Sequence, residues 1–244
     1  AKGRTIISNA AKEPEIVDLA EFLNRSGAKI TGFGGDIIEI EGVSQLKGLK
    51  DPYRVISDRV ECCTLLIAAA ITKGDICVYH ANHRHVTAIL EKFEEMGLDV
   101  SVGDDFIRVR YQGPFKGIDF TTTPFPGFPT DVQAQMMSLL TLAQGTSSIK
   151  EAIFENRYMH ANELIRMGAD ITLKKEYAYI KGVDQLGGSE VKMTDLRAGA
   201  ALILSGLAAE GETIIYGLHH VERGYDRLPE KLISLGAKMD YCDD

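Results

Sequence analysis

Three stretches of the chain share one pattern: DRVECCTLLIAAAITKG at residues 58–74, DVQAQMMSLLTLAQG at 131–145 and DLRAGAALILSGLAAEG at 195–211. Each begins with an aspartate, continues as a largely apolar run and ends at a glycine. An aspartate side chain accepts hydrogen bonds from the free N–H groups of a first helical turn, and glycine is favoured just after the last turn. Each stretch therefore predicts a buried helix that its aspartate caps.

The spacing of these stretches indicates an internal repeat. The opening aspartates are 73 and 64 residues apart, and the closing glycines are 71 and 66 apart. Another glycine series closes four amphipathic runs at intervals of 70, 71 and 68 residues, at Gly27, Gly97, Gly168 and Gly236. Self-similarity at a fixed period is typical of an architecture built from repeated units. The sequence predicts units of about 70 residues.

Each unit is expected to contain both helices and strands. A β-branched strand follows the buried helix, at 75–79 in one unit and at 212–216 in another. A second helix then carries apolar residues at helical spacing, and two strands, such as 98–102 and 106–110, close the unit around a tight turn. The predicted order is β-α-β-α-β-β, which places the protein in the α/β class.

The opening unit departs from this order. Residues 5–7 fit the strand that follows a first helix, and residues 13–26 fit the second helix, but no aspartate-led helix precedes them. Terminal repeats often differ from the others, usually in their outer face. The loss of a first helix and strand is a larger difference than that. We therefore expect a truncated or split chain rather than a natural start.

Composition excludes several classes of protein. Of 244 residues 45% are hydrophobic and 25% are charged, which is ordinary for a globular protein. A formal net charge of −8 argues against a broad nucleic-acid surface, although a local basic pocket stays possible. The apolar run at 198–209 is shorter than the roughly 18 residues of a membrane span, and no signal peptide opens the chain. We expect a cytoplasmic protein without nucleic-acid or membrane partners.

Asp131 differs from the other repeat aspartates in the segment that leads to it. The approach TPFPGFPT at 123–130 contains three of the seven prolines in the chain. Proline fixes φ and removes conformational freedom, so this segment would hold Asp131 stiffly, as a general base requires. Helix capping is the alternative role, and the threefold recurrence of the aspartate favours it.

Three arginines form a second group of candidates near the repeat junctions: Arg157, Arg197 and Arg223. Guanidinium groups suit the forked recognition of carboxylate or phosphate, and helix N-termini also favour anions. Structural ion pairs with neighbours such as Glu155 and Asp226 are the alternative role. The cysteines lack metal-ligand spacing, no phosphate-binding glycine loop opens a helix, and we predict neither a cofactor nor a metal site.

Five motifs resemble one family of bacterial enzymes in the same order along the chain: NAAKEPEIVDLAEFLNRSGAKI at 9–30, FPTDVQAQ at 128–135, FENRYMH at 154–160, TDLRAGAALILSGLAAEG at 194–211 and RGYDRL at 223–228. The chain is similar over essentially its whole length to the C-terminal portion of the UDP-N-acetylglucosamine 1-carboxyvinyltransferases, which are enolpyruvyl transferases. The motifs are long, so the resemblance is specific.

The resemblance implies an inverse α/β barrel, with helices inside and sheets facing outward. It implies that residues 1–50 are the last unit of one, incomplete domain and that residues 51–244 form a three-unit domain. The implied reaction transfers an enolpyruvyl group from phosphoenolpyruvate to the 3-hydroxyl of UDP-N-acetylglucosamine, the first committed step of peptidoglycan synthesis. The implied roles thus lie in cell-wall biogenesis, cell shape and cell division, and no cofactor or metal is implied.

The resemblance also implies roles for particular residues. Asp131 matches the proposed base at the sugar hydroxyl, and Ile153 matches a backbone contact to the sugar nucleotide. Arg223 matches a phosphoenolpyruvate-binding arginine, and Arg157 matches an arginine near the domain junction. Asp195 and Arg197 match residues around the same pocket that support the site or its closure.

The chain lacks other parts of the family pattern. The mobile loop with the proton donor and the N-terminal Lys-Asn segment have no counterpart, and none of Cys62, Cys63, Cys77 and Cys242 lies in a matching loop. We therefore expect the chain to require its missing N-terminal half for turnover. Two alternatives remain: an enzyme like 5-enolpyruvylshikimate-3-phosphate synthase, or a non-catalytic binding module that kept the fold.

Overall fold

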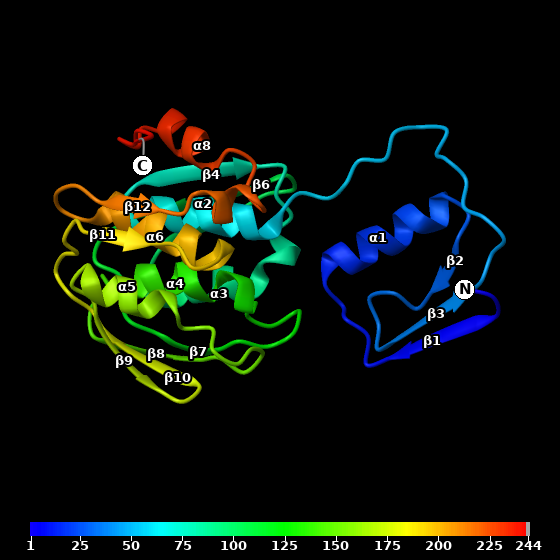
Figure 1. Cartoon of the computed structure of the whole chain (residues 1–244), viewed down its shortest axis with the longest axis horizontal. Helices are drawn as coiled ribbons and strands as arrows, with labels where there is room; N and C mark the ends of the chain where they lie inside the picture. Colours follow the sequence, from blue (N-terminus) through cyan, green and yellow to red (C-terminus); the bar gives the residue numbers. More distant parts are fainter. Residues whose placement is uncertain (243–244) are drawn as a thin grey trace.

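The computed structural model describes residues 1–242, which form a small and a large unit joined by an extended segment (Figure 1). Each unit has its own cluster of buried apolar side chains. The small cluster contains Ala10, Ala20, Ile30 and Ile38, and the large one extends from Val60 to Leu232. Between the two units, residues 42–58 contain no helix or strand.

The small unit is one helix on a three-stranded antiparallel sheet. Its elements are β1 (Arg4–Ser8), α1 (Pro14–Arg25), β2 (Lys29–Thr31) and β3 (Ile37–Glu41). The strand order is β1-β3-β2, so the last strand lies between the other two. The strand at 5–7 and the helix at 13–26 that the sequence predicted are confirmed as β1 and α1.

Three apolar helices fill the interior of the large unit: α2 (Arg59–Ile71), α4 (Gln133–Leu140) and α6 (Leu196–Ala208). They pack against one another, and all residues of α4 are buried. Because apolar residues surround these helices on most sides, each is stable only inside a protein. They correspond to the three aspartate-led stretches of the sequence.

Sheets lie on the outside of this helical core. The strands are β4 (Asp75–Tyr79), β5 (Asp99–Val102), β6 (Phe106–Arg110), β7 (Asp119–Thr121), β8 (Thr146–Lys150), β9 (Asp170–Lys174), β10 (Tyr177–Lys181), β11 (Glu190–Lys192) and β12 (Ile214–Tyr216). They form three sheets with the orders β4-β6-β5, β7-β8-β10-β9 and β11-β12. The remaining helices are η1 (His83–His85), α3 (Thr87–Met96), η2 (Thr130–Val132), α5 (His160–Arg166), α7 (His219–Glu222) and α8 (Leu228–Ser234).

The predicted order of elements is complete only in the middle unit of this part of the chain. There β7, α4, β8, α5, β9 and β10 follow one another as β-α-β-α-β-β. The preceding unit lacks the leading strand, and the last unit ends after α8 without its two closing strands within residues 1–242. A strand is stable only beside a hydrogen-bonding partner, which a repeat pattern in one chain does not guarantee. No helix among these residues is long and apolar enough to cross a membrane.

Candidate active site

The site lies where the first turns of the three buried helices meet. Asp58 caps α2 by accepting hydrogen bonds from the amides of Val60 at 2.7 Å and Glu61 at 3.0 Å. Asp195 caps α6 in the same way, through Arg197 N at 2.8 Å and Ala198 N at 3.0 Å. The capping predicted for these two aspartates is confirmed. The positive ends of the helices favour anions at this edge of the protein.

Asp131 does not cap its helix, and the capping role predicted for it is wrong. The α4 helix is preceded by the 3₁₀ turn η2, and its N-terminal cap residue is Val132, which offers no side-chain acceptor. The carboxylate of Asp131 therefore has no amide of that first turn to accept from. It is directed instead toward two guanidinium groups.

Arg157 and Arg197 hold the two oxygens of Asp131 separately. Arg157 Nη2 lies 2.8 Å from Oδ1, and Arg197 Nη2 lies 3.0 Å from Oδ2. The Asp131 side chain is 39% exposed, whereas those of Arg157 and Arg197 are 23% and 19% exposed. Burial alone would lower the pKa of Arg197, but the interactions of its guanidinium with the Asp131 carboxylate and with Tyr225 together outweigh burial and raise this pKa. The result is a fixed carboxylate that solvent or a ligand can still reach.

A network of buried hydrogen bonds holds the backbone of Asp131. Gln135 Nε2 on α4 donates to the Asp131 carbonyl at 3.0 Å and to Tyr225 Oη at 3.1 Å. Tyr225 Oη is also 2.9 Å from Thr64 Oγ1 on α2. Hydrogen bonds of this kind, between groups that water does not reach, link α2, α4 and the segment after α7. They fix the start of α4 relative to its neighbours.

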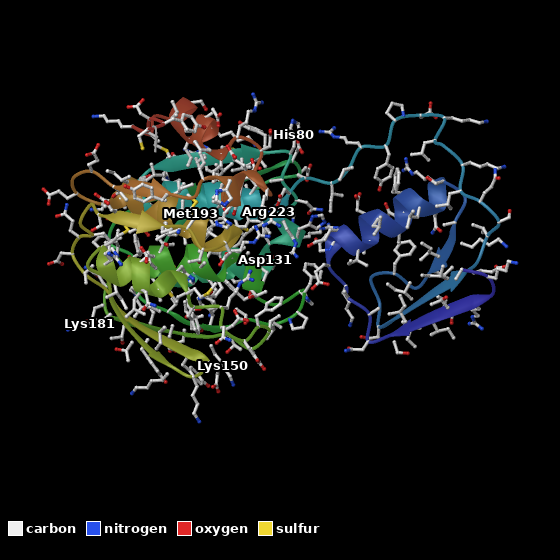
Figure 2. All side chains as sticks on the ribbon, in the orientation of Figure 1. His80, Asp131, Lys150, Lys181, Met193 and Arg223 are labelled. Carbon is white, nitrogen blue, oxygen red and sulfur yellow. The ribbon has the colours of Figure 1, made fainter. Side chains whose placement is uncertain are left out.

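Arg223 lies just after α7 and is exposed. The adjoining Gly224 packs so closely on α6 that a Cβ there would be 2.6 Å from Leu196 Cδ2. This contact brings Arg223 to the first turn of α6, next to the residue that precedes Arg197, and Figure 2 labels Arg223 and Asp131 in the same part of the large unit. No ion pair joins Arg223 to another of the residues that the structure describes. Its guanidinium is thus available to an anion.

Glu151 organises the segment on the other side of Asp131. It is 4% exposed, and its carboxylate accepts from Thr122 Oγ1 at 2.7 Å and from Thr130 Oγ1 at 2.9 Å. The amides of Ile153 and Phe154 donate to the same carboxylate at 2.9 and 3.1 Å. Glu151 therefore fixes both the residue before Asp131 and the loop that leads to Arg157.

The loop after Glu151 borders an open hollow of about 820 Å³. Ile153, Phe154, Arg157 and Met159 contribute to its lining. The Ile153 side chain is 39% exposed, and the Arg157 guanidinium lies over the Phe154 ring at 5.1 Å. Apolar and aromatic surface beside a charged group suits a ligand with both characters.

One ion pair connects the small unit to the segment that precedes Asp131. Glu15 on α1 accepts from Arg59 Nη2 at 2.7 Å and from Arg59 Nε at 3.1 Å. The Arg59 side chain is only 10% exposed, and its guanidinium lies 5.8 Å from the centre of the Phe125 ring in the proline segment before Asp131. The two units are thus joined at a wall of the candidate site.

His160 is buried near this group and has consequences for stability. It is the first residue of α5, and its Nε2 has no partner within residues 1–242. Burial, together with the charge of Arg157, lowers its pKa to about 4, although the Asp195 carboxylate acts in the opposite direction. The native imidazole is therefore neutral at pH 5, where an unfolded chain would carry it protonated.

This difference predicts a loss of stability in mild acid. Because the unfolded state binds a proton below about pH 6.5 and the native state does not, His160 lowers the free energy of unfolding by about 2 kcal/mol between pH 7.5 and pH 5. Urea denaturation at both pH values should show this loss in the unaltered chain and a smaller one in His160→Gln. An equal loss in both proteins would contradict the assignment.

The structure thus brings together three of the six residues proposed from sequence, Asp131, Arg157 and Arg197, while Arg223 adjoins Gly224, which packs on the first residue of α6. Asp195 supports the group as a helix cap, and Ile153 lies on the adjoining loop. Sequence reasoning missed Glu151, which lies outside the quoted stretches, and Arg59 and Glu15, which lie inside them without a feature that distinguishes them. Gln135 and Tyr225 were within quoted motifs, but nothing in the motifs separated them from their neighbours. Within residues 1–242 no group of three His, Cys, Asp or Glu side chains could hold a metal ion.

Buried helices inside outward-facing sheets, with an arginine-held carboxylate at the helix starts, define an α/β protein built from repeated units. The chain belongs to the EPSP synthase (3-phosphoshikimate 1-carboxyvinyltransferase) family, which it matches over residues 1–232. The enolpyruvyl transferase NikO from Streptomyces tendae has a similar structure, with a TM-score of 0.86, 27% identity and coverage of 98% of this chain and 57% of that one. EPSP synthase from Acinetobacter baumannii shares the fold at a TM-score of 0.79 and 21% identity, covering 100% of this chain and 59% of that one. These structures confirm the predicted inverse α/β barrel.

Curated relatives share more sequence with this chain. UDP-N-acetylglucosamine 1-carboxyvinyltransferase 1 of Caldanaerobacter subterraneus is 52% identical over 98% of this chain and 57% of its own length. The enzyme of the same name from Staphylococcus aureus strain RF122 is 50% identical over 100% of this chain and 58% of its own length. The chain therefore spans somewhat more than half the length of these relatives.

Proposed function

We propose that this chain supplies one side of an enolpyruvyl transferase site and acts with the part of its relatives' length that it does not cover. The transfer would run from phosphoenolpyruvate to the 3-hydroxyl of UDP-N-acetylglucosamine. The observation that carries the proposal is that Asp131, unlike the equivalent Asp58 and Asp195, is released from helix capping and held by two arginines on an accessible surface.

The chemistry follows from this geometry. The Asp131 carboxylate accepts the proton of the sugar hydroxyl as the hydroxyl oxygen bonds to C2 of the enolpyruvyl group. A proton must reach C3 as this bond forms. Phosphate then leaves from C2 while C3 gives up a proton, which restores the double bond. The donor for C3 has no candidate at this site, so we assign it to the uncovered part. The chain's own contribution is the base, its positioning and positive charge for the anionic groups.

Electrostatics favour an anionic co-substrate at Arg223. Asp131 already balances part of the charge of Arg157 and Arg197, and Glu15 pairs with Arg59. Arg223 has no ion-pair partner within the described residues and lies beside the first turn of α6. A phosphate or carboxylate there would meet both a guanidinium and a helix N-terminus.

The sugar nucleotide fits the hollow on the other side of Asp131. Ile153 and Phe154 supply apolar surface there, and Arg157 supplies a charge. The names of relatives that are 50–52% identical favour UDP-N-acetylglucosamine as acceptor. The EPSP synthase structures, at 21% identity, share the fold alone.

The wider role follows from the activity. A UDP-N-acetylglucosamine carboxyvinyltransferase would act in the cytoplasm in peptidoglycan precursor synthesis, and through it in cell shape and division. We assign residues 1–50 to the last unit of an incomplete domain and residues 51–244 to the second domain. The separate apolar clusters of the two parts support this division.

Reconstitution tests the proposal. The chain would be mixed with the uncovered part of the Caldanaerobacter relative, expressed separately, and phosphate release and the carboxyvinyl sugar nucleotide would be measured. We expect activity in the mixture and none from the chain alone. UDP-N-acetylglucosamine, but not shikimate 3-phosphate, should raise the melting temperature of the complex. Protection by shikimate 3-phosphate would favour the EPSP synthase-like alternative, and a folded but inactive complex that binds neither compound would favour a non-catalytic module.

A further inference from the structure

The segment between α7 and α8 carries Arg223 and is anchored by one buried side chain. Of residues 222–227, all of which the structure describes, only Tyr225 is buried, with 3% of its surface exposed. The amides of Gly224 and Tyr225 donate to Val221 O at 3.1 and 2.9 Å, so these bonds stay within the same turn. Together with the close packing of Gly224, the Tyr225 side chain therefore fixes where Arg223 lies against the helical core.

The Tyr225 hydroxyl lies among side chains from all three buried helices. Its oxygen is 2.9 Å from Thr64 Oγ1 on α2 and 3.1 Å from Gln135 Nε2 on α4. It also interacts with the guanidinium of Arg197 on α6. One hydroxyl thus contacts each of the helices whose first turns form the candidate site.

The direction of each hydrogen bond around Tyr225 follows from the chemistry of its partners. The NH₂ group of Gln135 and the guanidinium of Arg197 can only donate, so the Tyr225 oxygen accepts from both. The Thr64 hydroxyl uses its own hydrogen to donate to Val60 O at 2.9 Å. The Tyr225 hydrogen is therefore donated to Thr64 Oγ1, and burial, which raises the pKa of Tyr225, keeps this hydrogen in place at neutral pH. Loss of the hydroxyl would deprive three polar side chains of one partner.

Two routes connect this hydroxyl to Asp131. Gln135 Nε2, which donates to Tyr225, also donates to the Asp131 carbonyl at 3.0 Å. Arg197, which contacts Tyr225, donates to Asp131 Oδ2 at 3.0 Å. The same side chain that anchors the Arg223 segment is therefore linked to both the backbone and the carboxylate of Asp131.

We propose that Tyr225 is a positioning residue of the transferase site, and that its hydroxyl couples the place of Arg223 to the orientation of the Asp131 carboxylate. The inference rests on the proposed function, in which Arg223 holds the anionic co-substrate and Asp131 accepts the proton of the sugar hydroxyl. Reaction requires the two reacting groups to be held close together and correctly oriented. A rigid link between Arg223 and Asp131 sets that geometry.

The variant Tyr225→Phe removes the hydroxyl and keeps the ring. In the reconstituted complex we expect kcat to fall about tenfold, because a small misplacement of reacting groups slows transfer without removing any of them. KM for phosphoenolpyruvate should rise about fivefold or more, because Arg223 is less well placed. KM for UDP-N-acetylglucosamine should change less than about twofold, because Glu151 fixes the loop on that side of the site through its own bonds. Steady-state phosphate release measures all three constants.

Ser138→Ala is the matched structural control. The Ser138 hydroxyl is also buried, and it joins α4 to α6 by donating to Ala201 O at 2.8 Å. Ser138 lies seven residues beyond Asp131, in the interior of the helical core. Its loss should destabilise the fold, as the loss of the Tyr225 hydroxyl does, while kcat and both KM values stay nearly unchanged.

A double variant tests whether the hydroxyl acts through the proposed hydrogen bonds. Thr64→Val removes the acceptor of the Tyr225 hydrogen. Because both substitutions break the same bond, the loss of kcat in Tyr225→Phe with Thr64→Val should be smaller than the product of the two separate losses. Ser138→Ala should combine with Tyr225→Phe without such an interaction.

NMR of the chain alone tests the link without reference to activity. The relaxation of the Arg197 Nε–H group reports how rigidly this side chain is held between Asp131 and Tyr225 on the ps–ns timescale. We expect the order parameter of this group to fall in Tyr225→Phe and to stay unchanged in Ser138→Ala.

Several outcomes would overturn the proposal. One is a Tyr225→Phe complex with the kinetic constants of the unaltered complex, and another is a Ser138→Ala complex with the same changes in kcat and KM as Tyr225→Phe. An Arg197 side chain that is equally rigid in Tyr225→Phe and in the unaltered chain is a third. An unaltered mixture without turnover would count against the proposed function, while the NMR comparison would still decide whether Tyr225 holds Arg197.

Discussion

Replacement of Asp131 by asparagine is expected to lower kcat of the reconstituted transferase by about 10²- to 10⁴-fold, the usual contribution of a general base. Asparagine keeps the size of the side chain and can still accept a hydrogen bond through one oxygen. It cannot take up the proton of the sugar hydroxyl, and it removes the negative charge between Arg157 and Arg197. Steady-state phosphate release at saturating concentrations of both substrates measures the loss.

Asp58→Asn is the matched control for this variant. Asp58 begins the equivalent helix of another unit and accepts from two backbone amides. Asparagine caps helices about as well as aspartate, so kcat should change by no more than a few-fold. Equal losses in the two variants, or an Asp131→Asn enzyme that keeps nearly full activity, would exclude Asp131 as the base.

The buried helices and most strands could be predicted because their signals are local. Aspartate, apolar run and glycine recur at the start, body and end of α2 and α6, and β-branched residues mark β4. Helix capping and periodicity act within a few residues, so one chain is enough to reveal them. The repeat also indicated the α/β class.

The closing strands of the last unit could not be predicted in this way. The repeat led to the expectation of two strands after α8, but none forms there within residues 1–242. Strand formation depends on a hydrogen-bonding partner that can be distant in the sequence or on another chain. The pattern therefore describes what a segment can form, while its partners decide whether it does so.

The role of Asp131 shows the same limit at a functional site. The sequence presents three aspartates in equivalent positions, and two of them cap helices. Asp131 differs because η2 displaces the start of α4 and because its arginine partners lie 26 and 66 residues away. The proline-rich approach singled it out, but only the fold shows that its carboxylate is free of the helix.

Glu151→Ala is expected to lower the free energy of unfolding by about 3 kcal/mol or more, because buried donors that lose a partner cost about 1–3 kcal/mol each. The carboxylate accepts four hydrogen bonds: from the hydroxyls of Thr122 and Thr130 and from the amides of Ile153 and Phe154. Alanine leaves these donors in a site that is 4% exposed. Urea denaturation at pH 7.5 measures the change.

Glu151→Gln separates hydrogen bonding from packing. Its amide oxygen, in the place of Oε1, can still accept from the two backbone amides and from Thr122 Oγ1. Its NH₂ group, in the place of Oε2, can donate to the Thr130 hydroxyl, which rotates to accept. We expect the free energy of unfolding to fall by about 1 kcal/mol, because the hydrogen bonds are replaced by others rather than left unmade. Equal losses in the alanine and glutamine variants would contradict the network. Because Thr130 precedes Asp131 and the Ile153 loop leads to Arg157, the alanine variant should also weaken binding of UDP-N-acetylglucosamine in the reconstituted complex, even at temperatures where it remains folded.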